Sequence, residues 1–96
     1  MNEFAGNRIA EIRSRIDEID DGLVRLFEQR LSLVEMIARE KKKGNLPVGD
    51  PAREGEIVAR LTAGRPETVA EPVRGLFAAI FDLSRAYQAK LLECRA

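Results

Sequence analysis

Apolar residues recur at helical spacing along the first half of the chain. Between Asn7 and Lys43 there is no proline and a single glycine, and the apolar positions advance in alternating steps of three and four residues. This spacing predicts one long amphipathic helix over 7–43. The apolar line consists of Ile9, Ile12, Ile16, Ile19, Leu23 and Leu26, and it resumes at Leu33, Val34 and Ile37. The lysines at 41–43 suit the negative end of the helix dipole, and Gly44 is the expected C-cap.

A second helix is predicted after a short loop. Residues 44–49 have the composition of a loop, and Asp50 followed by Pro51 predicts an N-cap with proline at the first helical position. About a dozen residues later this helix should end near Gly64.

A third helix follows the connection at residues 65–67. Thr68 and Glu71 have the spacing of a capping box, which predicts the helix start, and the helix should run to about Leu92. Its apolar residues lie at positions 69, 73, 76, 77, 80, 83, 87 and 91. The predicted fold class is therefore all-α, with three helices in one domain over 1–96, and residues 1–6 are expected to be disordered.

The long helix is too long for its own domain. About 36 helical residues span roughly 54 Å, whereas a compact globule of 96 residues is only about 32 Å across. The two shorter helices cannot cover an apolar line of that length. We therefore expect an intertwined homodimer with two-fold symmetry.

Composition excludes several classes of function. Sixteen basic and sixteen acidic residues give zero formal charge, which argues against a nucleic-acid partner. The sequence shows neither a membrane-spanning apolar run nor a signal-peptide pattern, so the expected compartment is the cytoplasm. One cysteine, Cys94, and no histidine leave no disulfide, no usual metal site and no Ser-His or Cys-His nucleophile pair. The glycines form no phosphate-binding loop.

Two cations interrupt the apolar pattern of the long helix. The line predicts an apolar residue at position 30, but Arg30 stands there. Lys41 follows eleven residues later, about 16 Å along the axis and within roughly 20° of the same face. The two cations could bind an anion. Alternatively, Lys41 is solvated at the helix end and Arg30 reaches solvent or pairs with an internal carboxylate.

Other polar residues also have two interpretations. Arg13 could approach the Arg30 region of a partner chain in an antiparallel pairing of the long helices, or it could be a surface arginine. Ser84 and Gln88 lie one turn apart, so they could face inward together or lie at the boundary between core and solvent. Arg53 and Glu54 could be functional or belong to an ordinary capping network in the first turn of the second helix.

The order and spacing of these residues resemble the all-helical class of chorismate mutases, which are intertwined dimers of three-helix chains. The resemblance covers about residues 9–92. It rests on Ile12-Arg13, Ile16-Asp17-Glu18-Ile19-Asp20, Arg30, Lys41, Pro47-Val48-Gly49-Asp50-Pro51-Ala52-Arg53-Glu54 and Ser84-x-x-x-Gln88. The family resemblance implies the intramolecular Claisen rearrangement of chorismate to prephenate, in phenylalanine and tyrosine biosynthesis. That reaction needs no nucleophile, metal or cofactor, so none is expected.

The resemblance also implies a role for each residue. Lys41 and Gln88 are implied as the catalytic pair at the ether oxygen of the substrate, where negative charge grows as the C–O bond breaks. Substrate binding is implied for Arg30, for Arg13 of the other subunit, for Asp50 and Glu54 at the ring hydroxyl, and for Arg53 and Ser84 at a carboxylate. One departure is Gly49, where relatives can carry a basic side chain. The implied enzyme is monofunctional.

Two other functions compete with this one. An isochorismate-pyruvate lyase of the same fold would use a similar cationic pocket. We expect such a lyase to lack a carboxylate at the position where this sequence has Glu54. A non-catalytic helical dimerisation module would tolerate apolar residues at positions 30 and 88.

Overall fold

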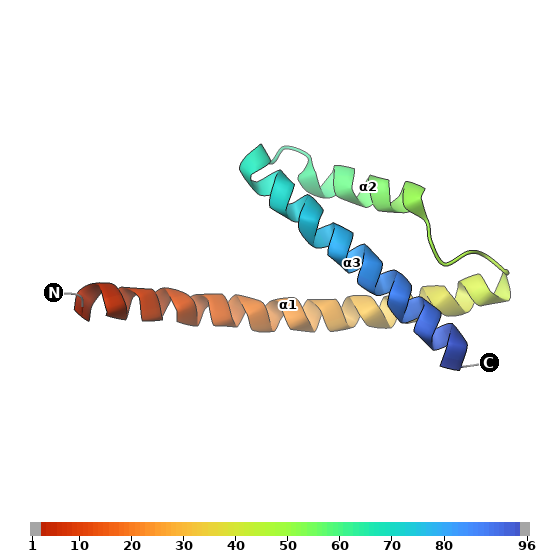
Figure 1. The fold of residues 1–96 in the computed structure, drawn as a ribbon, viewed down its shortest axis with the longest axis horizontal. Helices are drawn as coiled ribbons and strands as arrows, with labels where there is room; N and C mark the ends of the chain where they lie inside the picture. The colour runs from red at the N-terminus through yellow and green to blue at the C-terminus, as the bar shows by residue number, and fades with distance from the viewer. Residues whose placement is uncertain (1–2, 95–96) are drawn as a thin grey trace. The chain divides into compact units, whose positions relative to one another are not determined.

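The computed structural model describes residues 3–94, which are helical apart from two short connections. Helix α1 spans Glu3–Lys43, α2 spans Pro51–Thr62 and α3 spans Glu67–Cys94 (Figure 1). No strand occurs among the described residues. The all-α class and the three predicted helices are thus confirmed. The chain divides into two units between Ser32 and Leu33.

The first unit is the part of α1 before Leu33. Helix α1 begins at Glu3, earlier than the predicted start at Asn7. The expectation of disorder over residues 1–6 falls partly on residues 1 and 2, which lie outside the described residues, whereas residues 3–6 are helical. The predicted apolar line is exposed throughout this unit, at Ile9, Ile12, Ile16, Ile19, Leu23 and Leu26. Nothing in the unit itself therefore covers that line.

The second unit starts with the last turns of α1 and a well-defined helix end. The N–H of Leu46 donates to the carbonyl of Lys41 at 2.7 Å, and the N–H of Asn45 donates to the carbonyl of Lys42 at 3.2 Å. These two bonds form a Schellman motif, which needs a left-handed residue after the helix. Asn45, with φ 54°, is that residue, and Gly44 lies one position earlier than the left-handed turn requires.

A tight turn joins α2 to α3. Ala63 has φ −59° and ψ 129°, and Gly64 has φ 73°. The N–H of Arg65 donates to the carbonyl of Thr62 at 3.1 Å, which completes a type II turn with glycine at its third position. The predicted end of α2 near Gly64 is confirmed. The turn brings α2 back against α3, and these two helices pack on each other.

Helix α3 begins one residue before the expected capping box. The carbonyl of Pro66 accepts from the N–H groups of Val69 and Ala70, both at 2.9 Å, so Pro66 rather than Thr68 precedes the first helical turn. The capping-box prediction was therefore wrong in its position. Pro72 is the sixth residue of the helix, so its missing N–H removes the bond to the carbonyl of Thr68.

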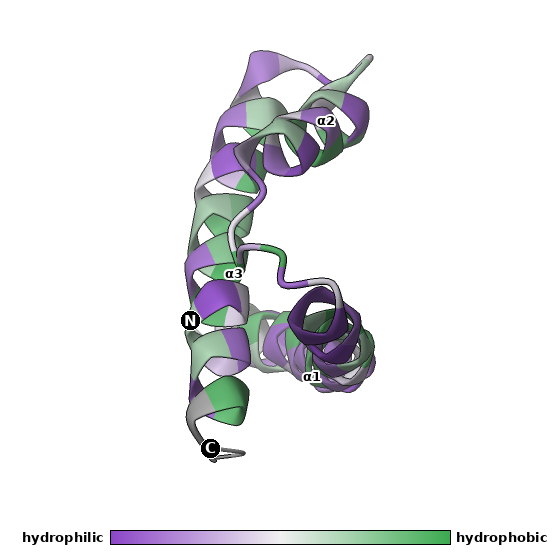
Figure 2. Cartoon of the chain, turned by 90° about the vertical axis from the view of Figure 1, so that its right-hand side faces the viewer, coloured by the Kyte–Doolittle hydropathy of each residue, from purple (hydrophilic) through white to green (hydrophobic). Residues whose placement is uncertain are grey.

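The buried face of α3 differs from the predicted apolar stripe. Ala70, Phe81, Ser84 and Gln88 are buried, whereas the stripe residues Val69, Leu76 and Leu83 are exposed. Phe77 packs edge-on against Phe81, with ring centroids 5.8 Å apart. Hydrophobic and hydrophilic residues are mixed along α3 (Figure 2), and its apolar residues include both buried and exposed ones. The spacing of the apolar residues in the sequence alone could not show which face of α3 is buried.

The end of α1 contributes the rest of the core in the second unit, through Val34 and Ala38. Leu33 and Ile37, which belong to the predicted line, are exposed. None of the helices over residues 3–94 combines the length and apolar character that crossing a bilayer requires.

Candidate functional site

The N-terminus of α2 has the predicted capping arrangement. The Asp50 carboxylate accepts from the N–H of Arg53 at 3.1 Å, and Pro51 occupies the first helical position. The Asp50 carbonyl accepts the N–H of Glu54 at 3.0 Å. The carboxylate and the carbonyl of Asp50 each accept one bond from the helix, and each keeps the capacity to accept another.

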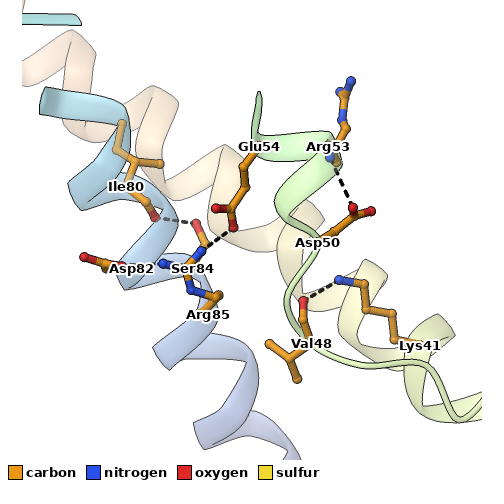
Figure 3. Close-up of polar contacts among 9 residues, drawn as sticks. All are labelled: Lys41, Val48, Asp50, Arg53, Glu54, Ile80, Asp82, Ser84 and Arg85. Atoms are coloured by element: carbon orange, nitrogen blue, oxygen red, sulfur yellow. Dashed lines mark hydrogen bonds and ion pairs between the residues drawn. The ribbon is translucent and has the colours of Figure 1, made fainter. Parts of the chain in front are cut away.

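Lys41 reaches from the end of α1 to the loop that precedes α2. Its Nζ donates to the carbonyl of Val48 at 2.6 Å, and the side chain is half-buried (Figure 3). An ammonium group has three N–H donors, so this contact fixes the charge and leaves donors for a ligand. The solvated lysine that the sequence allowed as an alternative is not what the structure shows.

Glu54 meets a residue that the sequence analysis missed. Its Oε2 forms an ion pair with Nη1 of Arg85, on α3, and Nη2 of Arg85 pairs with Asp82 (Figure 3). The pKa of Arg85 is raised above its ordinary value, chiefly because the guanidinium donates a hydrogen bond to Glu54. Glu54 and Arg85 are 31 positions apart in sequence, and only the packing of α2 on α3 brings them together. No local pattern in the sequence indicates this contact.

Ser84 and Gln88 face inward together, each with 6% of its surface exposed. The Ser84 hydroxyl donates to the carbonyl of Ile80 at 2.7 Å. Oε1 of Gln88 is buried and accepts no hydrogen bond from the described residues. A buried acceptor without a partner is costly. Gln88 therefore keeps unused hydrogen-bonding capacity at its Oε1.

Of the remaining predicted site residues, one lies in the second unit and two lie in the first. Arg53 is exposed, its guanidinium lies 3.6 Å from Glu56, and its side chain points away from Lys41 and Glu54 in Figure 3. Arg13 and Arg30 belong to the first unit, where Arg13 is exposed and Arg30 is half-buried. Six of the eight predicted site residues thus lie in the second unit: Lys41 near the end of α1, Asp50, Arg53 and Glu54 at the α2 N-terminus, and Ser84 and Gln88 on α3.

The hollows in the second unit are shallow and separate. Lys41 lines one with Ile37 and Leu46, and Glu54 lines another with Pro51 and Phe81. Over residues 3–94 no cluster of three or more histidine, cysteine, aspartate or glutamate side chains could hold a metal ion. The second unit thus presents the Lys41 ammonium and the Glu54 carboxylate in separate hollows and holds the Gln88 amide buried.

Comparison with known proteins identifies the family. Residues 12–89 match the family model described as chorismate mutase type II. A chorismate mutase of Methanocaldococcus jannaschii is 33% identical over 88 residues, which are 90% of this chain and 89% of that protein. A bifunctional chorismate mutase/prephenate dehydratase of Buchnera aphidicola is 35% identical over 91% of this chain, which matches 23% of that longer protein.

A solved structure agrees with these sequence matches. The chorismate mutase of Thermus thermophilus superposes with a TM-score of 0.73 and 38% identity, over 80% of this chain and 98% of that chain. The chain therefore belongs to the chorismate mutase type II family.

Proposed function

We propose that this protein is a chorismate mutase, an isomerase that converts chorismate to prephenate in the biosynthesis of phenylalanine and tyrosine. Family membership over residues 12–89 supports this activity. Within the structure, the observation that carries it is Gln88, a buried amide whose acceptor has no partner among the described residues. Because the reaction is a step of amino-acid biosynthesis, we place the protein in the cytoplasm.

The rearrangement requires positioned donors rather than a nucleophile. It is an intramolecular pericyclic step in which a dicarboxylate must be held in a compact, chair-like conformer. Donors are also needed at the ether oxygen, where negative charge develops as the C–O bond breaks. In our proposal the Lys41 ammonium and the Gln88 amide N–H are those donors. The bond from Lys41 to Val48, at 2.6 Å, supports this role because it holds the ammonium in one place.

The other proposed contacts orient the substrate. Arg30, together with Arg13 of the second subunit, binds the carboxylates through bidentate hydrogen bonds. Glu54 and the backbone of Asp50 accept from the ring hydroxyl. Arg53 and Ser84 support the carboxylate end, and both must change rotamer from the arrangement in Figure 3. These assignments follow the family resemblance, and the burial of Ser84 and the capped start of α2 are in accord with them.

We further propose that the active enzyme is an intertwined two-fold homodimer. The apolar line of α1, from Ile9 to Leu26, is exposed in the single chain. Burying one such side chain fully is worth about 1.5–3 kcal/mol, so pairing two copies of the line stabilises the assembly substantially. A second copy also supplies Arg13, which the second unit lacks.

Substitution of a single lysine tests the catalytic assignment. Replacing Lys41 by alanine should lower kcat/KM for chorismate by about 100-fold or more, because a donor to the developing charge is lost. Lys42→Ala is the matched control, since Lys42 is an exposed neighbour in the same helical turn. Equal activity of the two variants would contradict the role of Lys41, provided that circular dichroism shows unchanged helix content.

Mixing two inactive variants tests the shared site. If Arg13 acts across the subunit boundary, a dimer of one Arg13→Ala chain and one Lys41→Ala chain contains one complete site and one doubly defective site. Random exchange of subunits should then restore about one quarter of the wild-type activity. No recovery, under conditions where mass spectrometry detects the mixed dimer, would place Arg13 in its own chain's site or outside the sites.

A further inference from the structure

The ion pair between Glu54 and Arg85 links the two helices that carry most of the candidate site. Arg85 follows Ser84 directly and lies three residues before Gln88, so its Cα belongs to the same two turns of α3. Its guanidinium extends toward the first turn of α2, where it meets the Glu54 carboxylate (Figure 3). The Cδ of Arg85 also lies 3.8 Å from the position that a Cβ on Gly49 would occupy.

Two carboxylates hold the Arg85 guanidinium, one on each of its terminal nitrogens. Nη1 donates to Oε2 of Glu54, and Nη2 donates to Oδ1 of Asp82, one turn earlier on α3. A planar guanidinium with both of its terminal nitrogens engaged has little freedom to turn. The Glu54 side chain is 26% exposed and that of Arg85 is 38% exposed, so the pair is partly shielded from water. The two ion pairs of Glu11 on α1 are more exposed, with side chains 54–70% exposed.

The pair uses one carboxylate oxygen of Glu54 and leaves the other. Oε2 is occupied by Arg85, whereas Oε1 takes part in none of the side-chain hydrogen bonds found for residues 3–94. A glutamate on an exposed helical turn would sample several rotamers. Here the Arg85 guanidinium holds Glu54 in one rotamer, so Oε1 of Glu54 points in a defined direction.

We propose that Arg85 is a positioning residue for Glu54, which it orients to accept a hydrogen bond from the ring hydroxyl of the substrate. This inference rests on the proposed function, in which Glu54 receives that hydroxyl. Through Glu54, Arg85 thereby favours binding of a substrate that carries a hydroxyl group, without touching the reacting atoms. A role limited to clamping α2 on α3 is the competing explanation.

A double-mutant cycle separates these explanations. The variants are Arg85→Gln, Glu54→Gln and the combination of both, assayed as purified full-length protein with chorismate. Misorientation of one binding group should lower kcat/KM by about 10- to 100-fold in Arg85→Gln. In the Glu54→Gln background the same change should cost less than about twofold, because Arg85 then has no carboxylate to orient. Arg85→Lys, which keeps the cation, should recover part of the loss.

The kinetic constants give a second readout. The ring hydroxyl is bound in the ground state as well as in the transition state, so the loss in Arg85→Gln should appear mainly as a higher KM. A loosened fold would instead lower kcat by reducing the active fraction. Arg39→Gln is the matched control, since it removes another arginine–glutamate ion pair, with Glu35 on α1, and neither residue lines the hollows of Lys41 or Glu54. Its kcat/KM should stay at the wild-type value.

Three results would overturn the proposal. An equal fold-loss from Arg85→Gln in both backgrounds would show that Arg85 does not act through Glu54. A fall in kcat at constant KM, together with a lower unfolding midpoint, would assign the residue to the fold. Wild-type protein without mutase turnover would overturn the proposed function and this inference with it, whereas additivity in an active enzyme overturns the inference alone.

Discussion

Replacing Gln88 by methionine should stabilise the protein and inactivate it. Gln88 is 6% exposed, and its Oε1 accepts no hydrogen bond from the described residues. Methionine has a similar length and flexibility and adapts well to irregular packing. The substitution therefore removes an unpaired buried acceptor while filling nearly the same space.

The size of both effects follows from the local structure. An unsatisfied buried polar group costs about 1–3 kcal/mol, so removing it should raise the free energy of unfolding by about 1 kcal/mol after small packing losses. For a domain of this size that corresponds to an unfolding midpoint about 4–8 °C higher. The thioether cannot donate to the ether oxygen, so kcat/KM should fall by about 100-fold or more.

Thermal unfolding at a fixed protomer concentration and initial rates of chorismate loss measure the two effects. Gln29→Met is the matched control, because Gln29 is the other glutamine of the chain and is exposed. It should change stability by less than about 0.5 kcal/mol and leave the rate unaltered. Destabilisation of Gln88→Met by more than about 1 kcal/mol would show that the amide supports the fold. Full activity would remove Gln88 from the catalytic machinery.

Further predictions concern the connections of the second unit. Gly64→Ala should destabilise the protein by about 1 kcal/mol because the φ of Gly64, 73°, is left-handed. Gly55→Ala should stabilise it by about 0.5–1 kcal/mol, because Gly55 lies within α2 and has open space around it. Chemical denaturation of the two variants checks the opposite signs. Asp50→Ala should destabilise by about 1 kcal/mol through loss of the N-cap, and Asp50→Asn should not. Equal unfolding midpoints for these two Asp50 variants would show that the cap contributes nothing.

Local signals predicted the helices because each boundary depends on a few neighbouring residues. Asp50 and Pro51 mark the start of α2 through chemistry that the structure reproduces, and Gly64 marks its end. Thr68 was predicted to cap α3, but the carbonyl of Pro66 accepts the first bonds of that helix. At the end of α1, Asn45 rather than Gly44 takes the left-handed conformation. Such competition between neighbouring signals moves a boundary by one or two residues without changing the fold.

The candidate site was predictable only where its residues interrupt a pattern. Ser84 and Gln88 are polar residues one turn apart on an apolar helix, and both are buried. Arg85 gave no comparable signal, since its partner Glu54 is 31 positions away and their contact depends on how α2 packs on α3. Packing also decided that Phe81 rather than Leu83 is buried, which the apolar period left open.

Product analysis with the wild-type protein tests the central claim most directly. Purified protein should consume chorismate, followed by its absorbance, and chromatography should show prephenate as the product. Isochorismate, tested in parallel, should yield no pyruvate. Pyruvate from isochorismate with negligible prephenate would contradict the mutase assignment in favour of a lyase. Absence of turnover with both substrates would contradict the claim that this protein is an enzyme of this reaction.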